Sequence, residues 1–412
     1  MGHDVYPNAL FHMNCLYTYV SLSGVIRSYS TPAKMYAKKI PFLLPFAGAL
    51  KIFVYDDTVV GLQSFLSNSE ECKNFVFGTE VILPEIFANS TSVATLSELD
   101  ADLFYVPLNI ACTYYSSSTA NSSAMDEALL SDMGFALDLI LDSLPYFEQR
   151  DGRNHVFNLF FKGLFPGWRA KLRNSIILTP ETEVEFEISS SYFPEAHRVG
   201  MAFPPFNSRR DIVIPPFMNI KQLEYLASHA QPSDQSRMWL VSFFGKRWVD
   251  VNEGFWVRER MMSLFDNVKD AYIHAVDTIR DFRPLSIVAE IMGRSKFCLV
   301  PRGRSAWTTR LYDAWWAGCV PVVLSDHFVL PYRHWVDPTT VLIQWPTAAI
   351  DTSLVKFLRS ISEERIQQFR RAAERIRCMF VYPNDSQFCL NQASAISALT
   401  AQLELYAREH EE

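Results

Sequence analysis

Residues 295–326 read SKFCLVPRGRSAWTTRLYDAWWAGCVPVVLSD, and this stretch predicts the fold of the second half of the chain. An apolar run, Phe297–Val300, leads into a Gly-containing loop. A helix is expected from about Thr308 to Ala317, and a second apolar run follows at Val320–Leu324. Strand, loop, helix and strand in this order are one unit of a parallel α/β sheet. The loop after the first strand is where such sheets bind anions, through free N–H groups at the start of a helix.

The same alternation continues on both sides of this stretch. Strands are expected where β-branched and aromatic residues run together, at Lys51–Tyr55, Asp102–Pro107, His155–Phe161, Ser175–Leu178, Asp211–Ile214 and Met238–Phe244. Helices are expected at Met125–Leu144, Trp256–Leu264, Pro284–Gly293, Ser362–Arg377 and Asn391–Glu409. A chain of 412 residues is long enough for two domains. We therefore expect an α/β protein with two doubly wound, Rossmann-like domains facing a cleft.

The polar stretch QPSD at 231–234 is the expected linker. It divides an N-terminal α/β domain at 51–232 from a C-terminal α/β domain at 233–380. A leader at 1–50 comes first, and a C-terminal helix at 381–412 is expected to pack back on the N-terminal domain.

Composition excludes several classes of protein. Apolar residues make up 49% and charged residues 20% of the chain, as in globular proteins. The net charge of −7 gives no general attraction to nucleic acid, which is not an expected partner. The 7 Cys residues include no C-x-x-C motif and no Cys/His cluster, so we expect no zinc site.

The odd number of Cys residues leaves at least one thiol unpaired. Disulfides among the others are open, and Cys378 and Cys389 are the pair closest in sequence. Cys298 and Cys319 lie in apolar runs and are interpreted as buried small hydrophobic residues. Three N-x-[ST] triplets, at Asn89, Asn121 and Asn384, fit a lumenal protein but also arise by chance.

Basic residues gather after the strand that ends at Pro301. Guanidinium groups donate forked hydrogen bonds that suit phosphate oxygens. Asp313 lies three positions after Arg310 on the expected helix, where it could reach ribose hydroxyls; a surface ion pair with Arg310 is the alternative. Arg247 follows a strand at the carboxyl end that should face the cleft. The residues predicted to bind a ligand with a diphosphate, the donor of any transfer reaction, are Arg247, Arg302, Gly303, Arg304, Ser305, Arg310 and Asp313.

The motifs FCLVPRGR and GCVPV resemble the signature of the exostosin family, glycosyltransferase family 47. Other blocks agree in order: KIFVYD at 51–56, ADLFYVP at 101–107, GRNHVFNLF at 152–160, DIVIPP at 211–216, FFGKR at 243–247 and LPY at 330–332. GRNHVFNLF and CLVPRGR are similar to the first glycosyltransferase domain of animal heparan-sulfate polymerases. Arg304 stands where many plant members have Asp, and Asp313 where the family more often has Glu.

The resemblance implies a GT-B fold and transfer of a sugar from a nucleotide diphosphate, with UDP expected, to a glycan or glycoprotein acceptor. It implies inversion at the anomeric carbon and a donor held by the C-terminal domain. No cofactor and no metal are expected. Relatives of this kind are type II membrane proteins of the Golgi apparatus with a lumenal catalytic domain. Residues 9–26 are apolar-leaning but interrupted by polar residues, so a disordered or packed leader is preferred to a weak signal-anchor there. A homo- or hetero-oligomer is left open.

An inverting transfer needs a base to deprotonate the acceptor hydroxyl. Asp57 is the predicted catalytic base because it ends the first strand and points to the cleft; the alternative is a turn cap. Tyr114, Tyr115 and Trp168 follow strands of the first domain and are predicted to stack on acceptor sugars, or else to fill the loop region. His155 lies at the amino edge of its strand and is interpreted as structural.

The D-x-D triplet at Asp100–Asp102 opens a strand instead of ending one, so we do not assign it to metal binding. A nucleotide-sugar epimerase is disfavoured because no G-x-G-x-x-G follows the first strand. Another GT-B transferase stays open. So does a catalytically weak partner subunit, which would keep the donor residues and require a paralogue for activity.

Overall fold

The structure is a computed structural model. It describes residues 50–62, 72–117, 127–160, 168–182, 206–231, 237–247, 253–277, 281–303, 305–382, 386–390 and 392–409. The leader up to residue 49, most of the expected linker and Arg304 lie outside these ranges. Residues 40–412 form one compact unit, which contains both sheets.

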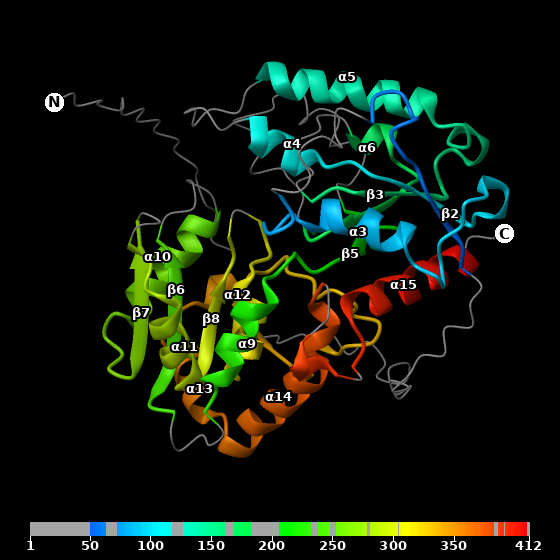
Figure 1. Ribbon diagram of the computed structural model, residues 1–412. Helices are drawn as coiled ribbons and strands as arrows, with labels where there is room; N and C mark the ends of the chain where they lie inside the picture. The colour runs from blue at the N-terminus through cyan, green and yellow to red at the C-terminus, as the bar shows by residue number, and fades with distance from the viewer. Residues whose placement is uncertain are drawn as a thin grey trace, which may run out of the picture. The chain divides into compact units, whose positions relative to one another are not determined.

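The described strands form two parallel sheets of five strands each. The first consists of β1 (Ile52–Val54), β2 (Leu103–Val106), β3 (His155–Asn158), β4 (Ile176–Thr179) and β5 (Ile212–Val213). The second consists of β6 (Trp239–Lys246), β7 (Ala271–Val276), β8 (Ser295–Pro301), β9 (Val320–Leu324) and β10 (Ile343–Gln344). Strands of both sheets can be followed with their flanking helices in Figure 1. The expected pair of parallel α/β domains is confirmed.

The two sheets differ in strand order. The described strands of the first sheet follow the chain, from β1 to β5. The second sheet has the order β10-β9-β8-β6-β7, so the direction of winding reverses between β6 and β8. A reversal of this kind makes a crevice beyond the carboxyl ends of the two strands, where α/β sheets bind ligands. Among the described strands, doubly wound topology is therefore present in the second sheet.

Helices connect the strands and bury apolar residues against them. In the first half they are α3 (Thr79–Ala88), α4 (Ile110–Ser117), α5 (Glu127–Ser143), α6 (Trp168–Lys171) and α9 (Ile220–Ser228). In the second half they are α10 (Glu253–Phe265), α11 (Leu285–Gly293), α12 (Arg310–Trp316), α13 (Thr352–Ser360), α14 (Glu363–Ile376) and α15 (Ala395–Glu409). Several have side-chain caps: Asn219 caps α9, Asp351 caps α13 and Ser362 caps α14. No helix among the described residues is both long enough and apolar enough to cross a bilayer.

One apolar core joins the two sheets. It includes Ile52 and Tyr105 from the first sheet and Val300 and Val323 from the second, with the fully buried Trp316 of α12. Trp315 next to it donates its indole N–H to the carbonyl of Val341 at 2.9 Å. Aromatic side chains of this size remove a large apolar area from water, so their burial contributes strongly to the stability of this core.

Three disulfides lie within the described residues. Cys378–Cys389 confirms the pair closest in sequence, and Cys72–Cys112 joins the segment before α3 to α4. Cys298 of β8 is bonded to Cys319, just before β9. Both residues are buried, as interpreted, but they are joined in a disulfide, which that interpretation did not include. The strands are parallel neighbours, and this brings the two Cα atoms within 5.7 Å, a distance that a disulfide spans.

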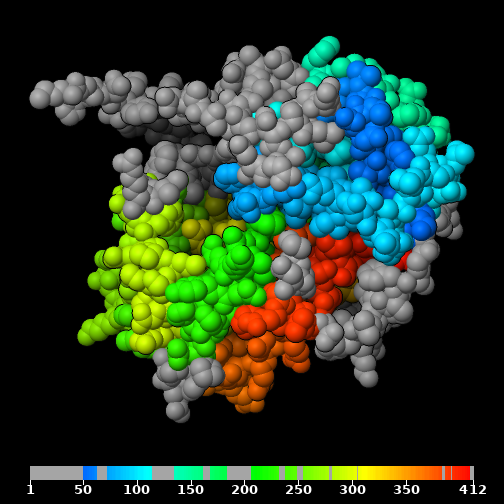
Figure 2. All heavy atoms as spheres, in the orientation of Figure 1, coloured from blue at the N-terminus to red at the C-terminus, as the bar shows by residue number. Residues whose placement is uncertain are grey.

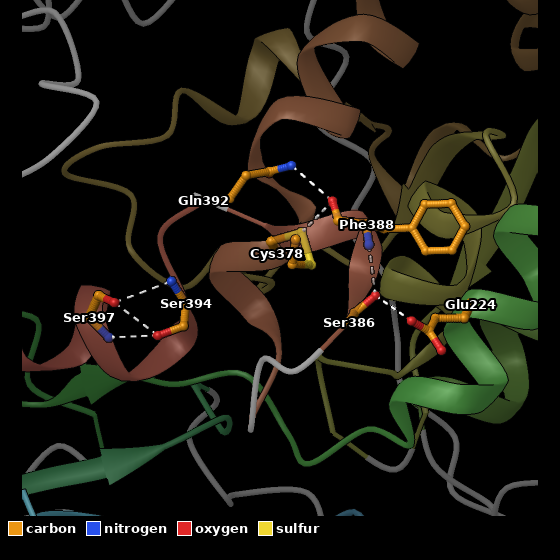
Figure 3. Close-up of a disulfide and its surroundings, with 8 residues drawn as sticks. Glu224, Cys378, Ser386, Phe388, Gln392, Ser394 and Ser397 are labelled. Atoms are coloured by element: carbon orange, nitrogen blue, oxygen red, sulfur yellow. Dashed lines mark hydrogen bonds between the residues drawn. A yellow bond between two sulfur atoms is a disulfide. The ribbon is translucent and has the colours of Figure 1, made fainter.

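Polar contacts around Cys378–Cys389 fix the chain before α15 (Figure 3). Ser386 donates its hydroxyl to Glu224 of α9 at 2.5 Å and accepts the N–H of Phe388 at 3.2 Å. Gln392 donates to the carbonyl of Phe388 at 3.0 Å. On the face shown in Figure 2, the green atoms around α9 accordingly lie beside the orange and red atoms of the C-terminal segments. The domain boundaries expected from the sequence stay predictions.

Candidate active site at the ends of β6 and β8

The crevice between β6 and β8 opens where their pairing stops. The register pairs Trp239 with Ser295, Val241 with Phe297 and Ser242 with Cys298. Beyond Ser242, β6 stays paired with β7 as far as Lys246, while β8 continues beside β9 to Pro301. The two strands thus part at their carboxyl ends, which is the geometry of a ligand crevice at a switch point.

Arg310 reaches across β6 at this opening. Its Nε donates to the carbonyl of Phe244, and its Nη1 donates to the hydroxyl of Thr308 at 3.2 Å. The guanidinium carbon lies 5.6 Å from the centre of the Phe243 ring. Burial lowers the pKa of Arg310, and the nearby carboxylate of Asp313 acts in the opposite direction. The side chain nevertheless stays charged at neutral pH, because arginine loses its proton only in strong alkali.

Gly245 makes room for this arrangement. A Cβ atom at position 245 would lie 2.5 Å from Nη2 of Arg310 and 2.8 Å from its Cζ. Glycine therefore occupies this position of the FFGKR motif because the side chain of Arg310 lies close to the backbone there.

The loop after β8 carries most of the predicted donor residues. Arg302 is buried, and its N–H donates to the carbonyl of Leu324, which extends the β8–β9 ladder at 3.1 Å. The N–H of Gly303 donates to the carbonyl of Ser305 at 3.1 Å. The helix begins only at Arg310 and has seven residues, so it starts later than expected and does not follow the loop directly. Arg304 lies outside the described residues.

Arg247 and Asp313 are the remaining predicted donor residues that the structure describes. Arg247 follows β6, with half of its side chain exposed, and its Nε lies 3.9 Å from the carboxylate of Asp277. Asp313 is half-buried on α12. Burial raises the pKa of the Asp313 carboxyl to about 6, with Arg310 acting in the opposite direction. No ion pair joins the described side chains of Arg310 and Asp313, so the surface ion pair considered as an alternative is not formed in this conformation.

One charged residue of this crevice was not predicted from the sequence. Arg258 of α10 is only 2% exposed, and it donates to the carbonyls of Lys246 and Arg302, the residues at the ends of β6 and just beyond β8. Nothing in the surrounding sequence GFWVRERMMSLF identifies it, because one arginine on a helix usually lies in solvent. A buried charge needs a hydrogen-bonding partner. This requirement is the one signal that could have indicated Arg258, which is a charged residue on an apolar helix face.

The residues predicted to contact the acceptor are spread over three places: the chain after β1, helix α4 and the start of α6. Asp57 follows β1 and is exposed, and its assignment as the catalytic base stays a prediction. The neighbouring Asp56 forms the turn cap, since its carboxylate accepts from the N–H of Thr58 at 3.0 Å. Tyr114 and Tyr115 lie on α4, and their side chains are outside the described part of the structure. Trp168 begins α6 with 3% of its surface exposed, so its ring belongs to the core and offers no face to a sugar.

His155 is fully buried at the start of β3. Its Nε2 lies 3.2 Å from the hydroxyl of Tyr55, and its Nδ1 lies 3.0 Å from the side-chain oxygen of Asn154. Burial lowers the pKa of His155 to about 3, so the ring is neutral in the folded protein. These contacts agree with a structural role.

Comparisons with known proteins agree with the geometry. The family model of the exostosin GT47 domain matches residues 47–361. The chain is 25% identical over 389 residues to the probable beta-1,4-xylosyltransferase IRX10L of Arabidopsis thaliana, covering 90% of this chain and 86% of that protein. It is 26% identical over 347 residues to a probable glucuronoxylan glucuronosyltransferase of the same plant, covering 79% of this chain and 64% of that protein.

Among solved structures, a glycosyltransferase from Rickettsia africae matches with 9% identity and a TM-score of 0.39, over 88% of this chain and 99% of that one. The family match spans more than half of the chain and includes both sheets. It also includes every residue of the crevice between β6 and β8. The protein is therefore a glycosyltransferase of the exostosin GT47 family.

Proposed function

We propose that the protein transfers a sugar from a nucleotide diphosphate, with UDP as the expected nucleotide, to a glycan acceptor. The observation that carries the proposal is the gathering of guanidinium groups at the switch point of the second sheet. Arg247, Arg258, Arg302 and Arg310 all lie at the ends of β6 and β8 or reach them, in a chain with a net charge of −7. A diphosphate is an anion that fits such a site, and its charge grows as the sugar leaves.

The donor assignment is tested by calorimetry with UDP. Arg310→Ala removes a guanidinium group and should weaken binding by about 1.5–3 kcal/mol, the range of charge-assisted hydrogen bonds. Arg304→Ala should act similarly. Unchanged UDP affinity in both variants, with circular dichroism showing the fold intact, would reject the assignment.

We further propose a single displacement with inversion. The name of the relative IRX10L specifies a beta-1,4 linkage, and a β-glycoside from an α-linked donor requires inversion. Asp57 is proposed as the base that takes the proton of the acceptor hydroxyl while its oxygen attacks the anomeric carbon and the diphosphate leaves. Asp57→Asn should lower turnover about 10²–10⁴-fold with little change in donor affinity. Product NMR showing retained configuration would reject inversion, and turnover within a few-fold of the parent would reject Asp57.

The arginines are proposed to neutralise the leaving diphosphate without a metal ion. A catalytically weak subunit that requires a partner is the second candidate, and the donor residues alone are compatible with it. Turnover by the purified chain without a partner decides between the two.

We propose that the catalytic domain works in the lumen of the Golgi apparatus. Three disulfides support an oxidising compartment. Asn89, at the end of α3, is exposed and its glycosylation triplet is accessible. The proposed type II anchor falls in residues outside the described part of the structure.

A further inference from the structure

Arg258 lies at the opening between β6 and β8 but was not among the predicted donor residues. It belongs to α10, which lies beside β6 in Figure 1 and contacts β7 and β8. Nη1 donates to the carbonyl of Lys246 at 2.5 Å, and Nε donates to the carbonyl of Arg302 at 3.1 Å. One side chain thus joins the ends of two strands that no longer pair with each other.

The two hydrogen bonds of Arg258 form a bridge at the place where β6 and β8 are no longer paired. The β6–β8 ladder ends at Ser242 and Cys298, four residues before each of the two bridged carbonyls. Without Arg258, these carbonyls would lack this hydrogen-bonded link across the crevice. Arg247 and Gly303 directly follow the two bridged residues, so the bridge lies at the base of the two loops that carry the donor residues.

The bridge also places two positive charges near each other. Arg258 and Arg310 lie over the same ring, with their guanidinium carbons 5.9 and 5.6 Å from the centre of Phe243. Among the described residues neither forms an ion pair with a carboxylate. Burial, and then the charge of Arg310, lowers the pKa of Arg258 to about 9. An anion in the crevice would relieve the repulsion between the two guanidinium groups.

We propose that Arg258 is a positioning residue of the donor site: it ties the ends of β6 and β8 together and so holds the loops of Arg247 and Arg302 at the spacing that receives the diphosphate. The proposal rests on the nucleotide-sugar function proposed above. Arg258 acts through backbone carbonyls, and its own contact with the donor is not required.

Arg258→Met removes both donors and keeps a long side chain, and Arg258→Lys keeps the charge without the planar fork that reaches two carbonyls. We expect UDP and inorganic pyrophosphate to bind at least tenfold more weakly to both variants. The KM for the donor should rise more than kcat falls, because the reacting groups themselves are unchanged.

Arg237, just before β6, provides a matched control at the same sheet. It is 3% exposed and donates to the carbonyls of Ser295, at 2.7 Å, and Gln231, at 2.9 Å. Ser295 begins β8, so these contacts lie at the opposite edge of the sheet from the donor site. Arg237→Met should therefore lower the melting temperature as a buried-arginine substitution does, and leave the dissociation constant of UDP unchanged.

Binding is measured by calorimetry in the full chain, well below the melting temperature of every variant. If Arg258→Met does not fold, Arg258→Lys carries the test. Parental affinity in Arg258→Lys would show that charge alone matters and would overturn the bridging role. Equal loss of affinity in Arg237→Met and Arg258→Met would overturn it as well. Failure of the parent chain to bind UDP would instead refute the proposed function, which distinguishes the two failures.

Discussion

Gly245→Ala is expected to damage donor binding while leaving the fold intact. The added methyl group would lie 2.5 Å from Nη2 of Arg310, so the guanidinium must move by about 1 Å to reach ordinary contact distance. That movement breaks its hydrogen bond to the carbonyl of Phe244. The backbone of Gly245 is not in the left-handed region, so alanine adds no backbone strain.

The expected magnitudes separate binding from stability. Loss of a charge-assisted hydrogen bond costs about 1.5–3 kcal/mol, which corresponds to roughly 10- to 150-fold in affinity if Arg310 holds the diphosphate. Replacing glycine by alanine lowers the entropy of the unfolded chain and contributes about 0.4–1 kcal/mol in favour of folding. The melting temperature should therefore change little, while the dissociation constant of UDP rises.

A double-mutant cycle isolates the contact. In an Arg310→Ala background the methyl group has space, so Gly245→Ala should have almost no further effect on UDP affinity. Calorimetry of the parent, both single variants and the double variant gives the coupling energy directly. The reasoning is refuted if Gly245→Ala binds UDP like the parent, or if its full effect persists when Arg310 is absent.

Three further outcomes are expected. Cys298→Ser opens a disulfide between residues 21 positions apart and should lower the free energy of unfolding by about 3 kcal/mol, seen as a lower urea midpoint under non-reducing conditions. His155 is neutral when folded but protonated below about pH 6.5 when unfolded, so its contribution to stability is present above that pH and is lost as pH falls from 6.5 toward 3. The parent should lose up to about 1.4 kcal/mol per pH unit in that window and His155→Gln less, in urea titrations at several pH values. Turnover should survive EDTA, and restoration by Mn²⁺ of activity lost in EDTA would contradict metal-independent transfer.

The sequence predicts most of the elements that are long and apolar, and it fails where the signal depends on neighbours. β8 and β9 are visible as short apolar runs with glycine or proline at or near their ends. β7, Ala271–Val276, was missed because its residues are mostly half-buried and include a histidine, so its apolar pattern is weak. α3 was missed because Pro84 interrupts its pattern and no side chain caps it.

The candidate site was only partly predictable for the same reason. The motif residues Arg302, Gly303 and Arg310 are recognisable along the chain, and strand direction places them at one edge of the sheet. Arg258 and the disulfide between Cys298 and Cys319 depend on which segments become neighbours after folding. Burial of Trp168 likewise depends on packing, and a tryptophan after a strand looks the same in sequence whether it faces a sugar or the core.

The apolar core shared by the two sheets limits how the enzyme can be divided into fragments. Residues of both sheets pack in one cluster around Trp315 and Trp316, so either half expressed alone would expose apolar surface that is normally covered. Such surface favours aggregation. We expect the chain to melt in a single cooperative transition and a fragment limited to the second sheet to be recovered from inclusion bodies. Mapping of donor contacts therefore requires the intact polypeptide, produced where its cystines can form.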